Sequence, residues 1–342
     1  MSRRVFDYNG ITSIEIEGST NLLERIARNV EGEMAETDFV NPDCRIKINE
    51  SDTLAEIEKD KRYDYLTVSN IGTPDRPSIK YTRYNTPVRT IHHKSDREYI
   101  VDINVKLDEA AGLICLRNYL SNNQQLSSFP LLHASLLSVD GRGVLISGDS
   151  RQGKTTLAVY LLQEQKADYV SDENVILDTD GETAKGLYVP RTPRVRFSTI
   201  ANSKLSEVLR DVDVERTDAT QYIDRDAIEM IIATKSFHVD AGLAFSRQSF
   251  CDLLKVNSKE SAPINTIIFS KYIEEGFNVK TIPFEKGIDQ LSKFGLKRKR
   301  HIDPRELEET RVDLPITNLK GVDFIEVEFS DFNSIARGGF RL

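Results

Sequence analysis

The residues with the clearest chemistry lie near the middle of the chain, where residues 145–157 read LISGDSRQGKTTL. This segment matches G-x-x-x-x-G-K-[ST] at its four fixed positions, which are Gly148, Gly153, Lys154 and Thr155. Glycines let backbone amides approach phosphate oxygens, the lysine carries a charge for the β- and γ-phosphates, and the threonine hydroxyl can ligate Mg²⁺. We therefore predict a Walker A phosphate loop for ATP and Mg²⁺ at residues 148–155, called the glycine loop below. The expected nucleotide contacts are Gly148, Asp149, Ser150, Arg151, Gln152, Gly153, Lys154, Thr155 and Thr156.

Two adjacent carboxylates, Asp172 and Glu173, follow the loop within the apolar residues 167–177, which predict a buried strand. Neighbours in a strand point to opposite faces, so the two acids need not share a role. One would be a Mg²⁺ ligand or support a ligand, and the other would be the base that accepts a proton from an attacking hydroxyl. The alternative is a strand end with two solvated acids.

A single histidine, His133, interrupts the apolar run LLHASLL shortly before the loop. An ionisable group in such a run is a candidate for a catalytic role, although a satisfied core histidine is the more common situation. His133 stays a candidate because it lies just before the glycine loop and the acid pair in the sequence.

The elements that must position these residues follow from hydrophobic periodicity and turn residues. In the second half, two apolar strands at 132–139 and 143–147 are joined by Asp140 and Gly141, a strong hairpin signal. A helix is expected at 154–165, directly after the loop. Further helices are expected at 202–212, 224–234 and 284–294, and further strands at 264–269, 279–283 and 322–329.

The first 126 residues differ from the rest in being rich in short strands. Strands are predicted at 11–17, 44–48, 63–68, 78–84, 88–92 and 98–105. Ser19 is the expected N-cap of a helix that ends at Met34, and a second helix is expected at 110–126. We therefore predict a smaller strand-rich α/β domain at 1–126 and a nucleotide-binding domain at 127–342. Because the hairpin makes two strands antiparallel, the sheet of the second domain should be mixed, in an α+β or α/β fold.

Composition narrows the class of protein. A net charge of -8 argues against a nucleic-acid binder, which usually presents a basic face. The three cysteines show neither metal-ligand spacing nor a disulfide framework. We see no signal peptide and no apolar run long enough to span a bilayer, so we expect a cytoplasmic protein with no membrane partner.

His133, the hairpin, the loop GDSRQGKT and the acids of SDE at 171–173 together resemble the HPr kinase/phosphorylase family. That family of serine and small-molecule kinases has the nucleotide-binding fold of phosphoenolpyruvate carboxykinase. Its pattern is a histidine, a short hairpin, a loop of the form G-x-S-G-x-G-K-S and a strand bearing A-D-D. The resemblance covers residues 131–177, with 15 positions from His133 to Gly148 and 18 from Lys154 to Asp172.

The resemblance implies that Asp172 is the general base and that Glu173 lies near the metal. It also implies that Lys154 and Thr155 hold ATP and Mg²⁺, with His133 near the transferred phosphate. Arg151 departs from the pattern because it replaces a loop glycine, whereas the changes at Thr155 and Glu173 are conservative. The family's later signature for the reverse phosphorolysis is not recognisable, which favours a kinase alone. The best-known members of that family form rings, so the resemblance is compatible with a homo-oligomer of this chain.

Three further arginines, Arg191, Arg194 and Arg196, lie in YVPRTPRVRF at residues 188–197. With two prolines nearby they could form a rigid loop that clamps an anion. The alternation around Arg194 and Arg196 equally fits an edge strand with solvated arginines.

These observations predict a kinase that moves the γ-phosphate of ATP to a serine-like hydroxyl on a protein, peptide or small metabolite. A second hypothesis is a nucleotide-dependent switch or assembly ATPase without a phospho-acceptor. A third is a binding module whose degenerate loop holds nucleotide structurally. The intact Lys154 and Thr155 argue against the third, and the absence of a long apolar strand ending in D-E favours the kinase over the second.

Overall fold

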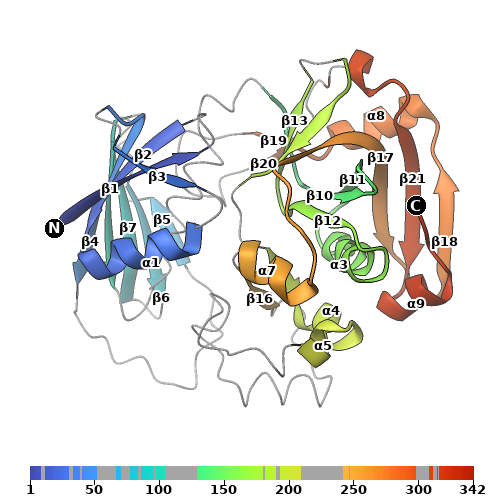
Figure 1. The fold of residues 1–342 in the computed structure, drawn as a ribbon, viewed down its shortest axis with the longest axis horizontal. Coiled ribbons are helices and arrows are strands. Elements are labelled where there is room, and N and C mark those ends of the chain that lie inside the picture. The colour runs from blue at the N-terminus through green and yellow to red at the C-terminus, as the bar shows by residue number, and fades with distance from the viewer. Residues whose placement is uncertain are drawn as a thin grey trace. The chain divides into compact units, whose positions relative to one another are not determined.

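The described part of the chain falls into two units. The computed structural model describes residues 1–8, 12–30, 34–38, 41–51, 67–70, 78–83, 86–95, 98–104, 129–179, 182–189, 193–208, 242–245, 247–297, 308–310, 314 and 316–342 (Figure 1). The N-terminal unit holds the described residues from Met1 to Asn104, and the C-terminal unit holds those from Phe129 to Leu342. Both combine helices with mixed sheets, so the fold is mixed α/β.

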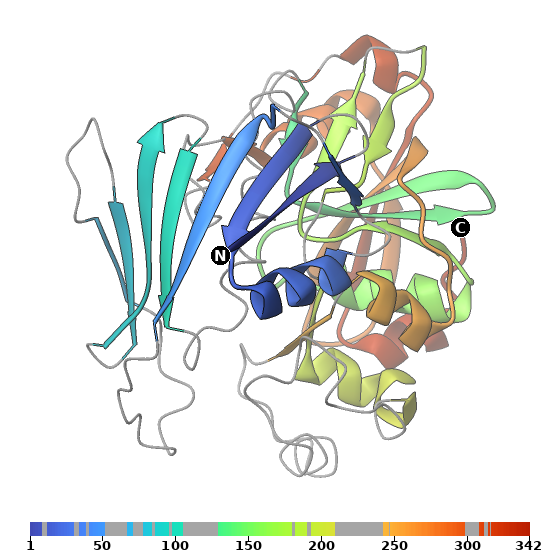
Figure 2. The same cartoon turned by 60° about the vertical axis from the view of Figure 1, so that its left-hand side comes forward.

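Eight described strands of the N-terminal unit form one sheet in the order β3-β1-β2-β4-β8-β7-β6-β5, seen edge to edge in Figure 2. Their bounds are β1 Ser2–Tyr8, β2 Thr12–Gly18, β3 Ala35–Thr37, β4 Cys44–Ser51, β5 Thr67–Asn70, β6 Ser78–Arg83, β7 Thr86–Ser95 and β8 Glu98–Asn104. The pairs β2–β4 and β4–β8 are parallel and the others are antiparallel. Each of the six predicted strands of this half overlaps one of these strands, although residues 63–66 of the strand predicted at 63–68 lie outside the described residues, and β1 and β3 were not predicted.

One helix, α1 (Thr20–Val30), packs against β1 and β2. Its start is capped by Ser19, whose Oγ accepts a hydrogen bond from the amide of Leu22 at 3.2 Å, as predicted. Leu22, Leu23 and Ile26 are buried, as the amphipathic pattern indicates. The predicted helix at 110–126 lies outside the described residues.

Eleven described strands of the C-terminal unit form its main sheet, with β15 and β16 paired separately. The strand bounds are β9 Leu131–Leu132, β10 Ala134–Val139, β11 Arg142–Ser147, β12 Asp168–Ser171, β13 Val175–Asp178, β14 Lys185–Leu187, β15 Arg194–Arg196, β16 Gly242–Ala244, β17 Ser261–Tyr272, β18 Phe277–Thr281, β19 Gly295–Lys297, β20 Glu308–Thr310 and β21 Asp323–Phe329. The helices are α3 Lys154–Glu164, α4 Phe197–Asn202, α5 Leu205–Val208, α7 Arg247–Leu254, α8 Phe284–Ser292, the 3-10 turn η6 Ile316–Leu319 and α9 Phe332–Arg337.

The predicted hairpin is present and makes the sheet mixed. β10 pairs antiparallel with β11, and Asp140 and Gly141 between them have φ values of 50° and 81°. Positive φ at both central residues is the two-residue turn that matches the strand twist. On its other side β11 pairs parallel with β17, and β17 pairs parallel with β21. The three parallel strands therefore end at the same edge of the sheet.

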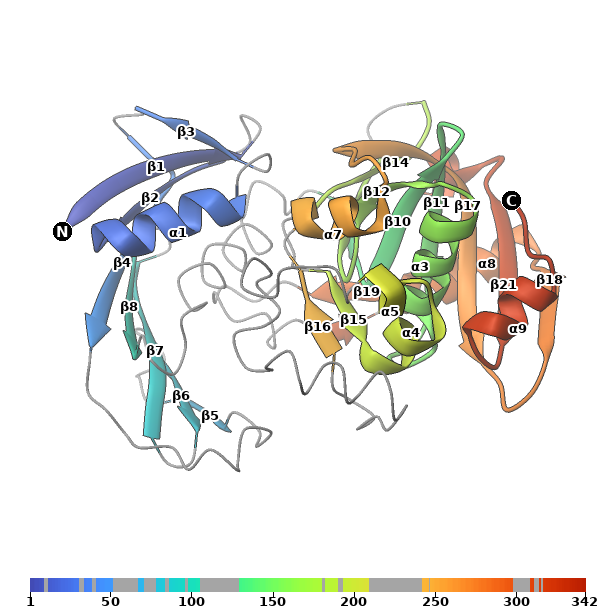
Figure 3. The same cartoon turned by 60° about the horizontal axis from the view of Figure 1, so that its bottom comes forward.

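Helices cover both faces of this sheet. On one face α3 lies along β10 and β11 in Figure 3, and its apolar side joins the core formed with Ile146, Val327 and Phe329. On the other face α8 packs against β21, where Gly287 leaves room for the ring of Phe324. Burying each such apolar side chain contributes about 1.5–3 kcal/mol, which fixes α3 and the loop before it.

Two predicted elements do not run unbroken over the residues expected for them. The single strand expected at 167–177 is two strands, β12 and β13, separated by a turn at 172–174. The break occurs because β12 pairs with β10 whereas β13 pairs with β9 and β14, so the chain crosses from one part of the sheet to another. The helix expected at 202–212 does not begin at residue 202, where α4 ends, but at Leu205 as α5, and residues 209–212 lie outside the described residues.

The remaining predictions for this half are met with shifted ends. β17, β18, α8 and β21 correspond to predicted elements, but β21 lies between β17 and β18 and is followed by α9. Asp331 caps α9 by accepting a hydrogen bond from the amide of Ser334 at 2.6 Å. The helix predicted at 224–234 lies outside the described residues, and α7 was not predicted.

Candidate functional site

The glycine loop connects β11 to α3, so it begins where a buried strand ends and finishes in a helix N-terminus. Its two fixed glycines are required by geometry. Gly148 has φ 152°, and a Cβ there would lie 2.7 Å from the carbonyl oxygen of Ser270. Gly153 has φ 83°, and a Cβ there would lie 2.4 Å from the ring of Phe329. Any side chain at either position would push the loop off the sheet.

The N-terminus of α3 offers amides to an anion. Gly153 is its N-cap residue, and among the described residues no side chain caps the helix or places an acid in its first turn. The first amides of a helix have no partner within it, and the helix dipole favours negative charge there. This is the environment expected of a phosphate site.

Lys154, the first residue of α3, bends back over the loop. Its Nζ donates to the carbonyl oxygens of Gly148 at 2.9 Å and Asp149 at 3.1 Å. A lysine held by carbonyls at the loop mouth is placed to exchange those bonds for phosphate oxygens. The phosphate contact expected of Lys154 stays a prediction.

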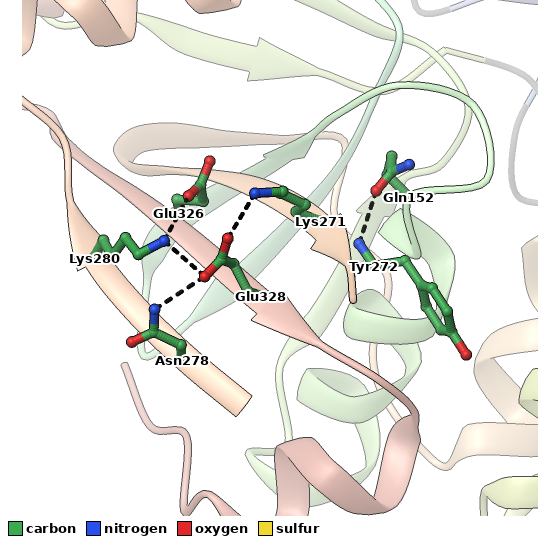
Figure 4. Close-up of polar contacts among 7 residues, drawn as sticks. All are labelled: Gln152, Lys271, Tyr272, Asn278, Lys280, Glu326 and Glu328. Atoms are coloured by element: carbon green, nitrogen blue, oxygen red, sulfur yellow. Dashed lines mark hydrogen bonds and ion pairs between the residues drawn. The ribbon is translucent and has the colours of Figure 1, made fainter. Parts of the chain in front are cut away.

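The other loop residues differ in what they contact. Asp149, Ser150 and Arg151 are exposed, and Arg151 has φ 68°, the left-handed conformation that its usual glycine would adopt without strain. Gln152 accepts a hydrogen bond through Oε1 from the backbone amide of Tyr272 at 2.8 Å, which ties the loop to the end of β17 (Figure 4). The hydroxyl of Thr156 lies 2.8 Å from that of Thr199. Thr156 is thereby joined to α4.

Asp172 and Glu173 are adjacent in the turn between β12 and β13, but their side chains differ in burial. Asp172 is 4% exposed, whereas the side chain of Glu173 is 47% exposed. Glu173 has φ 67°, and the amide of Asn174 donates to the carbonyl of Asp172 at 2.8 Å. The two acids therefore differ in burial, and they lie in a strained turn and not in the continuous strand that was expected.

Asp172 is a buried acid with one oxygen left over. The hydroxyl of Ser135, on β10, donates to its Oδ1, while its Oδ2 has no hydrogen-bond partner among the described residues. Burial, together with the neighbouring charge of Glu173, raises the pKa of Asp172 to about 6, against the opposing effects of Ser135 and Lys154. A buried carboxylate oxygen without a partner is costly, and such groups are common at sites that receive a ligand.

His133 lies beside the same turn. His133 separates β9 from β10, just as the turn at 172–174 separates β12 from β13. Because β9 pairs with β13 and β10 pairs with β12, His133 lies opposite that turn. Its Nε2 is 3.7 Å from Oε2 of Glu173, and its side chain is 19% exposed. The structure thus brings His133 beside Glu173, the exposed member of the acid pair.

The residues present fit a Mg²⁺ ion held jointly with a nucleotide. No group of three or more His, Cys, Asp or Glu side chains in the described ranges forms a metal site. Mg²⁺ in nucleotide sites is usually held by one or two carboxylates with substrate phosphates, so such a cage is not required. Oδ2 of Asp172 has no hydrogen-bond partner among the described residues, so this carboxylate oxygen can contact an incoming ligand.

A second polar cluster lies near the loop, on the opposite face of β17. Glu328 accepts hydrogen bonds from Lys271 at 2.7 Å, Lys280 at 2.7 Å and Asn278 at 2.9 Å (Figure 4). These donors, Lys271 first, lower the pKa of Glu328 to about 2. The cluster joins β17, β18 and β21 across the sheet and was not predicted.

The arginines of 188–197 are placed only in part. Arg194 and Arg196 lie on β15, which pairs antiparallel with β16, and Val195 between them is buried. Arg191 lies outside the described residues. The expected strand at these residues is therefore present as β15, whereas the anion clamp stays a prediction.

Sequence reasoning missed Ser135 and Tyr272. Ser135 follows His133 by two positions in an apolar run, and this polar interruption was the available signal. Tyr272 gives no signal in the sequence, because its contact with Gln152 joins residues 120 positions apart.

Comparison with known proteins does not assign a family. No protein-family model matches the chain, and no curated protein matches it. One similar solved structure is the HPr(Ser) kinase/phosphatase from Coxiella burnetii, at 12% identity over 61% of this chain and 95% of that chain, with a TM-score of 0.24. A TM-score and an identity this low do not establish a shared fold or function. None of the described helices is long and apolar enough to cross a membrane.

Proposed function

We propose that this protein is a kinase that transfers the γ-phosphate of ATP to a hydroxyl group on a protein, a peptide or a small metabolite. The observation that carries the proposal is Asp172: a buried acid, raised in pKa, with a partnerless oxygen, close enough to Lys154 to feel its charge. The carboxykinase-type arrangement of loop, histidine and acids is part of this proposal.

The glycine loop would bind the phosphate chain through the amides of the loop and of the first turn of α3. Lys154 would leave the carbonyl oxygens that it now contacts and place its charge on the β- and γ-phosphates. Thr155 and Glu173 are the residues that would hold Mg²⁺, and that ion, when bound, neutralises charge on the phosphate oxygens.

Asp172 would accept the proton of the acceptor hydroxyl through Oδ2. As the hydroxyl oxygen forms its bond to the γ-phosphorus, the bond from that phosphorus to the bridging oxygen breaks, and ADP leaves with the electron pair. A pKa of about 6 suits this role, because the base is ionised near neutral pH yet still basic enough to take the proton. Ser135 would hold the carboxylate in position through Oδ1.

His133 and Glu173 stand beside this proton transfer. With Nε2 and Oε2 at 3.7 Å, the exposed carboxylate can orient the imidazole toward the transferred phosphate. This arrangement supports a role for His133 in stabilising charge on the transferred phosphate. It also supports a second role for Glu173, which would orient His133.

The test is ATP consumption by the purified chain, with and without fractions of a cell extract as the source of acceptor, for wild type and Asp172→Asn. We expect slow consumption alone, acceleration by an acceptor fraction, and loss of that acceleration in Asp172→Asn. Fast hydrolysis without acceptor that survives the substitution would instead establish an ATPase.

A further inference from the structure

The end of β17 lies beside the glycine loop. β11 and β17 run parallel, and Ser147, the last residue of β11, is level with Phe269. β17 continues for three more residues, to Tyr272, alongside the segment in which the chain from β11 has become the loop. A residue at this position is next to whatever the loop holds.

Tyr272 is bonded to the loop through its backbone and leaves its ring exposed. Its amide donates to Oε1 of Gln152 at 2.8 Å, and Figure 4 shows the ring directed away from that bond and from Lys271. The residue is 54% exposed, and only Met1, Val279 and Leu342 share its status as large exposed apolar residues in the described ranges. A single exposed aromatic is common on protein surfaces, so its position is what matters.

Strand alternation places the ring on the same face as α3. Lys271 points to the opposite face, where it contacts Glu328, so the next residue, Tyr272, points to the α3 face. Phe329 pairs with Tyr272 in the register of β17 and β21, and its ring packs against Gly153 of the loop. Tyr272 and the loop therefore share one face at one edge of the sheet.

The site has a direction. Asp172 follows β12, which reaches β11 through β10, whereas Tyr272 ends β17 on the other side of β11. A triphosphate lying across the loop with its γ-phosphate toward Asp172 must direct its nucleoside toward β17. An aromatic ring stacks on any nucleobase, because every base has a π-face.

We infer that Tyr272 is a stacking platform for the base of the bound nucleoside triphosphate. The inference rests on the proposed function, since it takes the γ-phosphate to lie toward Asp172. It adds a base-binding residue that accepts purines and pyrimidines alike, because stacking alone does not read hydrogen-bond edges. The backbone bond to Gln152 fixes the end of β17 against the loop, so the ring is held in place before the nucleotide arrives.

The test compares ATP with inorganic tripolyphosphate, which has the phosphates but no base. Tyr272→Ala should weaken ATP binding roughly tenfold while leaving tripolyphosphate binding unchanged, and Tyr272→Phe should keep wild-type affinity for both. Val279→Ala, which removes another exposed apolar side chain, is the matched control and should change neither. Isothermal titration calorimetry gives all of these constants.

A second readout uses the absence of tryptophan from the chain. Tyr272→Trp introduces a single tryptophan, which can be excited selectively over the tyrosines, and ATP should quench its emission whereas tripolyphosphate should not. A tryptophan introduced by Val279→Trp should respond to neither. Equal ATP affinity of wild type and Tyr272→Ala, with no ATP quenching in Tyr272→Trp, would overturn the inference and leave the kinase proposal intact. If wild type binds neither ligand, both fall together.

Discussion

The hydroxyl of Ser135 donates a hydrogen bond to Oδ1 of Asp172, across the pairing of β10 with the end of β12. This contact leaves Oδ2 as the only oxygen of the buried carboxylate without a partner among the described residues. It also opposes the effect of burial on the Asp172 pKa. The orientation and the basicity of the proposed base therefore both depend on a residue of the strand before the loop.

Ser135→Ala should move the acidic limb of the pH–rate profile upward. Loss of a hydrogen bond to a charged group, worth about 1.5–3 kcal/mol, corresponds to a rise of roughly one unit or more in the pKa of Asp172. Because the base must be ionised, kcat/KM should fall about tenfold near pH 6 and little at pH 8. Ser138→Ala, at another buried serine of β10, should leave the profile unchanged. An equal loss at every pH would contradict the assigned role of Ser135.

Asp172→Asn should abolish phosphotransfer and yet stabilise the fold at neutral pH. The folded-state pKa lies above the unfolded value, so ionisation of Asp172 lowers stability as the pH rises from about 4 to about 6. Above that window the variant should be more stable by on the order of 2 kcal/mol, and below about pH 4 the difference should vanish. Urea unfolding at pH 7.5 and pH 4 measures it. Asp323→Asn, at an exposed strand start, should show no such trend.

Lys154→Met should weaken ATP binding without unfolding the protein. The Nζ of Lys154 donates to the carbonyl oxygens of Gly148 and Asp149, at 2.9 and 3.1 Å, so its charge lies at the loop that would bind the phosphates. Losing a charge-assisted contact should cost roughly tenfold or more in affinity. Calorimetric titration with MgATP and a thermal melt check both statements. Lys286→Met, on the exposed side of α8, is the control, and an unchanged ATP affinity in Lys154→Met would argue against the loop as the binding site.

Glu328→Gln should lower stability in a pH-dependent manner. Three donors keep the folded-state pKa of Glu328 at about 2, below the unfolded value of about 4.3. Its contribution is therefore fully present above pH 4.3 and is lost as the pH falls toward 2. The difference in unfolding free energy between wild type and variant should shrink over that range, and Glu285→Gln, exposed on α8, should show no such change. A difference that is constant with pH would contradict the ionic nature of the cluster.

The local parts of the site were predictable because local residues determine them. Asp140 and Gly141 both have positive φ, which the dipeptide signals directly, and the hairpin follows. Gly148 and Gly153 are required by the close approach of Ser270 and Phe329, and the loop pattern carries that requirement in its glycines. α3 then begins at Lys154, the position at which the pattern places it.

The rest of the site depends on pairings between distant segments. The apolar residues of 167–177 predict one buried strand that carries two acids, but β12 and β13 pair with different parts of the sheet, and the chain turns at 172–174 between them. Ser135 becomes the partner of Asp172 through that same pairing. Tyr272 meets Gln152 across 120 residues, through the parallel alignment of β11 and β17. Periodicity carries no information on such alignments.

The most direct test of the central claim follows the γ-phosphoryl group itself. ATP carrying ¹⁸O in its γ-phosphate is incubated with the wild-type chain or Asp172→Asn and an acceptor fraction, and the products are analysed by mass spectrometry. The account predicts that wild type places the labelled phosphoryl group on a hydroxyl as a phosphate ester and that Asp172→Asn does not. Recovery of the label solely as inorganic phosphate, equally from both proteins, would contradict it.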